Sequence, residues 1–225
     1  MFTFKGVHAS TYGTVLTAPT FKRAQKRTNL LEVDGADGVI REDLGYDVYS
    51  TSAKVLLNDN ANLDAFVAWL SGNGQLILDE DSSKYVTAYC DEEVEYFRLS
   101  LGVNKKVAVV RFLVTEPFRY KLSESDTTLV ASGTFTNLGT YFSEPLLKLT
   151  GTGTVVLTIG SQSFTYVFDT PYVFIDCKTR NAYYGAVYKN RKMTGNFPVL
   201  NVGANAISWT GTLTELVITP RTRYL

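Results

Sequence analysis

Histidine and cysteine are scarce in this chain of 225 residues, which has one histidine and two cysteines. A serine or cysteine triad needs an imidazole-type base beside its nucleophile, and His8, the single histidine, has no nucleophile motif near it. A structural zinc site needs clustered Cys and His side chains, which the sequence lacks. Cys90 and Cys177 lie far apart within strand-like runs, so we expect reduced core residues and not a disulfide. These shortages predict a protein that is not an enzyme and that holds no metal or cofactor.

Long apolar runs and net charge are lacking too. The sequence has no run of 18 apolar residues and no basic opening followed by an apolar segment, so we expect neither a membrane helix nor a signal peptide. Basic and acidic residues each number 22, which leaves no overall positive footprint for nucleic acid. Residues 1–127 hold 14 basic and 18 acidic residues (net −4), whereas residues 128–225 hold 8 and 4 (net +4). The opposite signs of the two halves indicate two separate surfaces.

The abundant residues favour β-structure. The chain has 14 Tyr and 13 Phe, and Thr and Val recur, a mixture typical of pleated, half-buried strands. One segment has the i, i+3, i+4, i+7 spacing of an amphipathic helix, with Trp69 beside the apolar stripe formed by Leu63, Phe66, Val67 and Leu70. This spacing predicts a single helix over about residues 62–71. Asn60 or Asn62 can cap its start, and Gly72 can close it.

A polar stretch over residues 121–128 separates two compositions. Before it, Tyr46–Leu57 alternates polar and apolar residues and predicts one long strand. After it, short strands with frequent turn signals recur up to residue 219, with a tight turn at Gly151-Thr152-Gly153 and a strand over Ala182–Tyr188. The predicted fold class is mainly β, with one α-helix in the first half and a β-sandwich in the second.

Two charged segments are candidate binding sites. The acidic run Asp79-Glu80-Asp81 is best explained as a solvated hairpin tip, because consecutive tip residues point apart and calcium-loop spacing is missing. The basic run Lys22-Arg23-Ala24-Gln25-Lys26-Arg27 can face a polyanion such as DNA, or it can be a solvated or inter-subunit loop, which we favour. A turn signal, Asp34-Gly35-Ala36-Asp37-Gly38, follows it.

Several stretches occur in the order of a known family along nearly the whole chain. They are Phe2-Thr3-Phe4-Lys5-Gly6, Leu31-Glu32-Val33-Asp34-Gly35, Trp69-Leu70-Ser71-Gly72-Asn73-Gly74, Glu116-Pro117-Phe118-Arg119-Tyr120, Gly195-Asn196-Phe197-Pro198 and Thr219-Pro220-Arg221-Thr222-Arg223-Tyr224-Leu225. Together they resemble the distal tail proteins (the Dit family) of phages with long, non-contractile tails.

The resemblance implies a structural virion protein at the phage tail tip, assembled in the bacterial host cytoplasm. Family members form homohexameric rings, single or stacked in pairs, that join the tail tube to the tip or baseplate and let DNA pass through a channel. The implied ring-forming domain is 1–125, an N-terminal β-sandwich with one α-helix, and 126–219 is implied to be a galectin-like or carbohydrate-module-like β-sandwich. Residues 220–225 are a tail that returns to the first domain. The implied partners are the tail tube protein, a tail-tip hub protein and receptor-binding or baseplate proteins.

Closing a ring needs two different patches that meet on neighbouring subunits. Residues 22–41 are basic at one end and acidic around Asp34 and Asp37, which predicts an inter-subunit contact through Lys22, Arg23, Lys26, Arg27, Asp34, Asp37 and Arg41. A second hypothesis is a carbohydrate-binding adsorption module that contacts the host cell wall. Its candidate sugar-stacking residues are Tyr183, Tyr184 and Tyr188, although packing in a core or interface is the favoured role for them. A glycan hydrolase with two facing acids is disfavoured.

Overall fold

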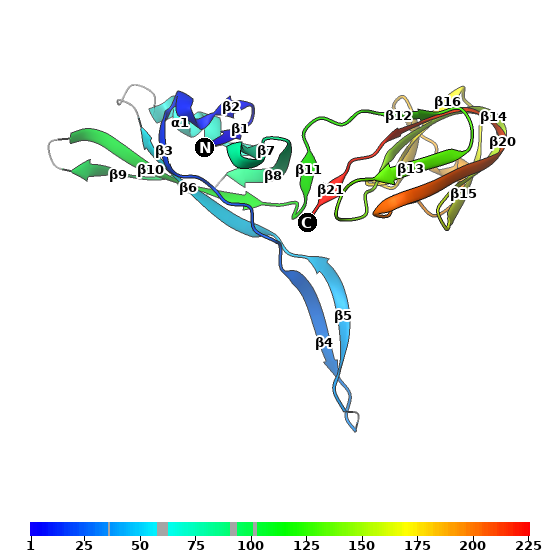
Figure 1. Ribbon diagram of the computed structural model, residues 1–225, viewed down its shortest axis with the longest axis horizontal. Helices are drawn as coiled ribbons and strands as arrows, with labels where there is room; N and C mark the ends of the chain where they lie inside the picture. Colours follow the sequence, from blue (N-terminus) through cyan, green and yellow to red (C-terminus); the bar gives the residue numbers. More distant parts are fainter. Residues whose placement is uncertain (36, 58–62, 91–93, 101–102) are drawn as a thin grey trace. The chain divides into compact units, whose positions relative to one another are not determined.

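The computed structural model describes residues 1–35, 37–57, 63–90, 94–100 and 103–225. These residues form two compact units, Met1–Leu122 together with Leu225, and Ser123–Tyr224. Strands dominate both units, as Figure 1 shows. The predicted mainly β fold class is therefore confirmed.

The first unit is built on an antiparallel sheet. Its strands follow the order β2-β1-β7-β8-β10-β6-β3, with β9 paired to β10 and β11 paired to β8. Their bounds are β1 Phe2–Phe4, β2 Val7–His8, β3 Gly13–Thr17, β6 Tyr49–Leu57, β7 Gly72–Leu78, β8 Lys84–Cys90, β9 Glu95–Ser100, β10 Val103–Val114 and β11 Arg119–Lys121. Short 3-10 turns η1 (Ala9–Thr11) and η3 (Asp79–Asp81) connect β2 to β3 and β7 to β8.

Helix α1, Leu63–Leu70, is the only α-helix in the described part of the chain, and it confirms the predicted helix. Its buried face differs in detail from the predicted stripe: Trp69 is 7% exposed, whereas Val67 is 36% exposed. Trp69 turns inward because its indole Nε1 donates a hydrogen bond to the Phe4 carbonyl oxygen at 2.8 Å and its ring stacks on Tyr12. The expected caps Asn60 and Asn62 lie outside the described residues, and Gly72 opens β7 with φ +82°.

A separate two-stranded sheet leaves the first unit between β3 and β6 (Figure 1). It pairs β4, Lys26–Glu32, with β5, Val39–Tyr46, and we call it the ribbon. The predicted strand Tyr46–Leu57 is confirmed over Tyr49–Leu57 as β6, but Tyr46 belongs to β5, and the chain passes from the ribbon into β6 through Asp47 and Val48. The Asp47 carboxylate accepts a hydrogen bond from the Val48 amide at 2.9 Å, which stabilises this change of direction.

The second unit is an antiparallel sandwich with strand order β12-β20-β14-β16-β17-β18, in which β13 pairs with β20, and β15 pairs with β14 and β19. The strands are β12 Thr127–Leu129, β13 Gly133–Asn137, β14 Leu146–Ile159, β15 Gln162–Val167, β16 Tyr172–Asp176, β17 Asn181–Tyr184, β18 Val187–Tyr188, β19 Met193–Gly195, β20 Gly203–Thr219 and β21 Arg223–Tyr224. A 3-10 turn, η4 (Asn190–Lys192), precedes β19. Alternate residues of β14 and β20 enter a core that includes Leu147, Leu149, Val155, Leu157, Leu216 and Ile218.

Two predictions for this unit are wrong. The sequence Gly151-Thr152-Gly153 lies inside β14 and is not a tight turn between strands. The glycines are accommodated within the strand by shifts in the register of its pairing with β20. A Cβ on Gly151 would lie 2.4 Å from the Thr212 carbonyl oxygen, so this glycine permits a close backbone approach. The predicted strand Ala182–Tyr188 is a β17–β18 hairpin, turned by Gly185 at φ +56°.

The end of β16 carries a partly buried ion pair. Arg221 donates to both Asp176 carboxylate oxygens, with Nη1 2.6 Å from Oδ1 and Nη2 3.2 Å from Oδ2. The same carboxylate accepts from the amides of Lys178 and Thr179 at 3.0 and 3.3 Å. Burial opposes ionisation of Asp176, but these four donors together hold the pKa of its carboxyl below the usual range.

Cys90 and Cys177 are both free and buried, as predicted. Burial raises the pKa of the Cys177 thiol, so it remains protonated at neutral pH. No helix among the described residues has the length and apolar character to cross a membrane.

Candidate functional site

The ribbon is the most exposed secondary structure of the first unit. Every described residue from Gln25 to Gly45 is exposed to solvent, and within the described chain β4 and β5 form a sheet of their own. At its base, the Asp47 amide donates to the Gln25 carbonyl oxygen at 2.8 Å, which closes the ribbon where it joins the unit. An isolated two-stranded sheet is marginally stable in water at best. The ribbon therefore has the character of a segment that becomes covered.

The pairing register assigns each side chain to one of two faces. Leu31 lies opposite Ile40, and Leu30 lies opposite Arg41, while Glu32 lies opposite Val39. Because successive residues of a strand alternate between faces, Leu31 and Ile40 share one face, and Leu30 and Val39 share the other. The ribbon is therefore apolar on both faces near its turn.

These aliphatic side chains are unusually exposed. The exposed fractions of the ribbon's aliphatic residues are Leu30 58%, Leu31 47%, Val33 49%, Val39 52%, Ile40 58% and Leu44 51%. Single exposed aliphatics are ordinary, but a contiguous group on one slender element indicates an interaction surface. Since both faces carry such residues, a partner that covers only one face would leave the other apolar face in water.

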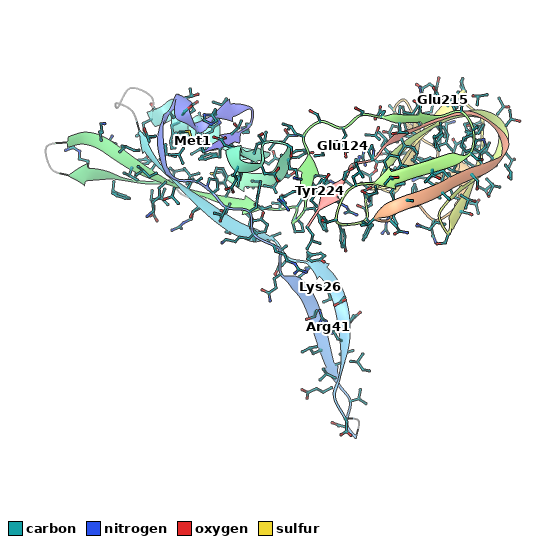
Figure 2. The ribbon with its side chains drawn as sticks, in the orientation of Figure 1. Met1, Lys26, Arg41, Glu124, Glu215 and Tyr224 are labelled. Atoms are coloured by element: carbon teal, nitrogen blue, oxygen red, sulfur yellow. The ribbon has the colours of Figure 1, made fainter. Side chains whose placement is uncertain are left out.

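The charged residues predicted for this region do not all come together. Lys26 and Arg41 both pair with Asp43, with Arg41 Nε 3.2 Å from Asp43 Oδ1, and Figure 2 shows Lys26 and Arg41 on the ribbon. The hydrogen bond from Lys26, and next its charge and that of Arg41, hold the pKa of the Asp43 carboxyl below its usual range despite slight desolvation. Arg27 donates from Nη2 to the Leu44 carbonyl oxygen at 3.3 Å. The ribbon shaft is thus internally charge-paired.

The remaining predicted residues lie at the two ends. Lys22 and Arg23 precede the ribbon, and Lys22 Nζ donates to the Ser50 carbonyl oxygen of β6 at 2.9 Å. Asp34 and Asp37 lie in the turn between β4 and β5. The base is consequently basic and the turn is acidic, and the shaft between them carries three basic and three acidic residues, which cancel in net charge.

Sequence reasoning missed the apolar part of this site. It identified the cations and the two turn aspartates but not Asp43 or the aliphatic pairs. The signal was present as two apolar dipeptides, Leu30-Leu31 and Val39-Ile40, on either side of the glycine-containing turn. Matched apolar runs around such a turn are typical of a hairpin.

The edge strand β9 is a second exposed apolar feature of the first unit. Tyr96 and Phe97 are 46% and 52% exposed, and β9 pairs only with β10 in the described sheet. Exposed edge strands with apolar side chains are prone to pair with another chain unless they are covered. The first unit therefore presents two different patches, the ribbon and β9.

The acidic segment Asp79–Asp81 caps the turn between β7 and β8, and two of its carboxylates have separate partners. Asp79 faces His8, with Oδ2 3.2 Å from Nε2, whereas Asp81 contacts Lys84 at 3.0 Å and Arg119 at 3.2 Å. Burial opposes ionisation of Asp81, but hydrogen bonds from Lys84 and Ser83 and the nearby cations lower the pKa of its carboxyl. Across the described residues, no three His, Cys, Asp or Glu side chains are grouped to hold a metal ion.

One solved structure has a similar fold over the whole chain. The crystal structure of the Dit protein of phage SPP1, described as a paradigm of hub adsorption apparatus in phages that infect Gram-positive bacteria, matches 100% of this chain and 98% of that one, at 12% identity and a TM-score of 0.75. The chain has the distal-tail-protein fold. A chain of the phage P2 baseplate in its activated conformation matches 92% of this chain and 91% of that one, with 10% identity and a TM-score of 0.43. No protein-family model and no curated protein matches the sequence.

The relation to the SPP1 distal tail protein confirms the resemblance found in the sequence at the level of the fold. The match covers both units, including the ribbon, because it spans the whole chain. At 12% identity it does not assign a role to any individual residue of the ribbon.

Proposed function

We propose that this protein is a structural subunit of a phage tail tip. In this proposal it forms a homohexameric ring that joins the tail tube to the tip or baseplate and anchors adsorption proteins. The observation that carries the proposal is the ribbon, whose apolar side chains are exposed on both faces in the single chain. The distal-tail-protein fold supports the same conclusion.

A ring requires a heterologous contact, in which one patch of a subunit meets a different patch of its neighbour. The ribbon and strand β9 supply two different exposed patches within the first unit. The ribbon is basic where it joins the unit and acidic at its turn. Because each end attracts groups of the opposite charge, this arrangement favours a ribbon that lies extended across a neighbouring subunit. We therefore assign ring formation to domain 1–125 and the inter-subunit contact to the ribbon and the residues around its base.

The other partners follow from this role. The second domain, 126–219, faces the receptor-binding or baseplate proteins in the proposed assembly, and the ring contacts the tail tube protein and a tail-tip hub protein. DNA passes through the channel in transit without being recognised. The protein acts in the virion after assembly in the host cytoplasm, and its role is structural and not catalytic.

Removing the ribbon tests the proposal directly. Residues 26–46 are replaced by Asn-Gly, since Gln25 and Asp47 are already hydrogen-bonded across the base and can be joined by a two-residue turn. We expect the wild-type chain to assemble into hexameric rings with rising concentration in native mass spectrometry and negative-stain images. The shortened chain should remain monomeric while its thermal unfolding midpoint stays close to that of the wild type.

Two results would overturn the proposal. Rings formed by the shortened chain would show that the ribbon is not the inter-subunit contact. A wild-type chain that stays monomeric at every concentration up to about the millimolar range, where even weak specific contacts are populated, would refute ring formation by this protein alone.

A further inference from the structure

A basic segment of the second unit shares no residue with the ribbon and has no place in the proposed ring contact. Residues 178–192 contain five Lys and Arg residues and no Asp or Glu. The segment comprises the turn after β16, the β17–β18 hairpin at the end of the sheet order, and η4. Its cations are exposed except for Lys189, which is partly buried; they are Lys178, Arg180, Lys189, Arg191 and Lys192.

Two shallow hollows lie along this segment, and Tyr188 lines both of them. The first, about 270 Å³, contains no charged side chain and is lined by Thr179, Asn181, Tyr183, Gly185, Ala186 and Tyr188. The second, about 400 Å³, is lined by Asp169, Tyr188, Lys189, Asn190, Arg191 and Lys192, which gives it a net charge of +2. A neutral hollow and a cationic hollow therefore adjoin at one tyrosine ring.

The tyrosines give the neutral hollow an apolar wall. Tyr183 and Tyr188 are direct cross-strand partners in the β17–β18 hairpin, so their side chains lie on the same face. Tyr183 also stacks on Phe174, its cross-strand partner in β16, with ring centroids 5.4 Å apart, whereas Tyr188 is 71% exposed. Tyrosine combines a flat apolar ring with a hydroxyl that bonds to water or to a ligand, which suits the mixed apolar and hydroxyl surface of a sugar.

Hydrogen bonds connect the segments that line the two hollows. The Asn190 amide nitrogen donates to the Asn181 side-chain oxygen at 3.0 Å, while the Asn190 side-chain oxygen accepts from the Ala182 amide. The Lys189 amide donates to the Ala182 carbonyl oxygen at 2.7 Å. These bonds tie η4 to β17, so both hollows exist before a ligand arrives.

The cationic hollow retains positive charge for a ligand. Lys189 Nζ lies 3.0 Å from the Asp169 carboxylate, and Lys192 Nζ lies 3.7 Å from it. The single acid is thus shared by two lysines, and Arg191 adds a third cation beside them. Arginine and lysine at such a site bind phosphate or carboxylate groups.

We propose that residues 178–192 bind an anionic saccharide. A sugar ring occupies the neutral hollow against Tyr183 and Tyr188, and its phosphate or carboxylate group occupies the cationic hollow beside Arg191 and Lys192. Each hollow has the size of a small ligand unit such as a sugar ring or an anionic group. Single-stranded nucleic acid sites use several successive aromatic platforms, whereas one tyrosine separates the two hollows. This role is independent of ring formation.

The test measures binding of the full chain to five probes in low-salt buffer by microscale thermophoresis. The probes are N-acetylglucosamine 1-phosphate, a trimer of galacturonic acid, an uncharged trimer of N-acetylglucosamine and a short single-stranded oligonucleotide, with an oligoglutamate peptide as the protein-like anion. We expect at least one of the two anionic sugars to bind at least ten times more tightly than the neutral trimer, the oligonucleotide and the peptide. Whichever anionic sugar binds identifies phosphate or carboxylate as the preferred group.

Variants then separate stacking from simple charge attraction. Tyr188→Ala should weaken anionic sugar binding about tenfold or more, Tyr188→Phe should retain it, and Arg191→Ser with Lys192→Ser should weaken it and reduce its salt dependence. Lys54→Ser with Lys105→Ser removes the same charge from exposed positions of the first unit and should leave binding unchanged. Binding of no sugar, equal binding of the peptide or oligonucleotide, or an unchanged affinity in Tyr188→Ala would overturn the proposal.

Discussion

The two apolar faces of the ribbon make a quantitative prediction about ring assembly. Two double variants each replace the aliphatic pair of one face by threonine, whose β-branched side chain suits a strand: Leu31→Thr with Ile40→Thr, and Leu30→Thr with Val39→Thr. If the ribbon is covered on both sides by neighbouring subunits, both variants should weaken assembly by similar amounts. If only one face of the ribbon contacts a neighbour, one variant should assemble much more weakly than the other.

The magnitude follows from the exposed fractions. Leu31 and Ile40 are 47% and 58% exposed, and Leu30 and Val39 are 58% and 52% exposed. The exposed surface of each pair therefore equals about that of one fully exposed aliphatic side chain. Burial of one whole aliphatic side chain contributes about 1.5–3 kcal/mol. Each double variant should therefore cost about 2 kcal/mol at every contact between subunits, which is roughly a 30-fold weaker association.

Sedimentation velocity over a concentration series measures this effect as the concentration at half assembly. The matched control is Val130→Thr with Leu138→Thr, which makes the same chemical change at second-unit positions that are 74% and 75% exposed. We expect the control to assemble like the wild type, and we expect all three double variants to unfold at temperatures similar to that of the wild type. Unchanged assembly of both ribbon variants would refute the reasoning that the exposed aliphatics form the contact.

Two stability predictions concern the second unit. Asp176→Asn leaves Arg221 without its carboxylate, so urea unfolding should show a loss of about 2–3 kcal/mol, less than for a fully buried pair because Arg221 is partly exposed. The pKa of Asp176 is lower in the folded protein than in the unfolded chain. The ion pair's contribution to stability is therefore complete above the ordinary carboxyl pKa and is lost as the pH falls through the lower pKa of the folded state. Unfolding midpoints measured from pH 7 to pH 2 should thus fall less steeply for the variant, and parallel curves would contradict this assignment. Gly211→Ala places a Cβ 2.2 Å from the Thr154 carbonyl oxygen at a residue with φ +89°, so it should lower the free energy of unfolding. A decrease of less than about 1 kcal/mol in the urea assay would show that β20 can shift to relieve the clash.

The sequence predicted those parts of the fold that depend on local pattern. Alternating Val, Thr and aromatic residues indicated strands, and the spacing of Phe66 and Leu70 indicated the helix, because each periodicity places apolar side chains on one face. It failed where glycine has a tertiary role. Gly151 was interpreted as part of a tight turn, but it allows β14 and β20 to approach closely within one sheet.

The candidate site was predicted only in part for a related reason. Charge is visible in a sequence, so Lys22, Lys26 and Asp34 stood out, whereas an aliphatic residue looks the same whether a core covers it or solvent surrounds it. Leu30 and Ile40 became informative only when the structure showed that the described chain does not bury them. The sugar-site tyrosines show the same limit, since the hairpin at Gly185 brings Tyr183 and Tyr188 together.

The comparison with the SPP1 distal tail protein bears on how these surfaces should be tested. An identity of 12% over the whole chain shows that one fold accepts widely different residues, as expected when a core needs apolar character and volume more than particular side chains. Binding specificity depends instead on exposed residues, which the fold constrains least. The ribbon and the 178–192 segment lie in different compact units and share no residue, so substitutions in one should leave the other's binding intact. Tyr188→Ala should accordingly assemble as the wild type does, and the shortened chain without the ribbon should bind the anionic sugar with unchanged affinity per subunit.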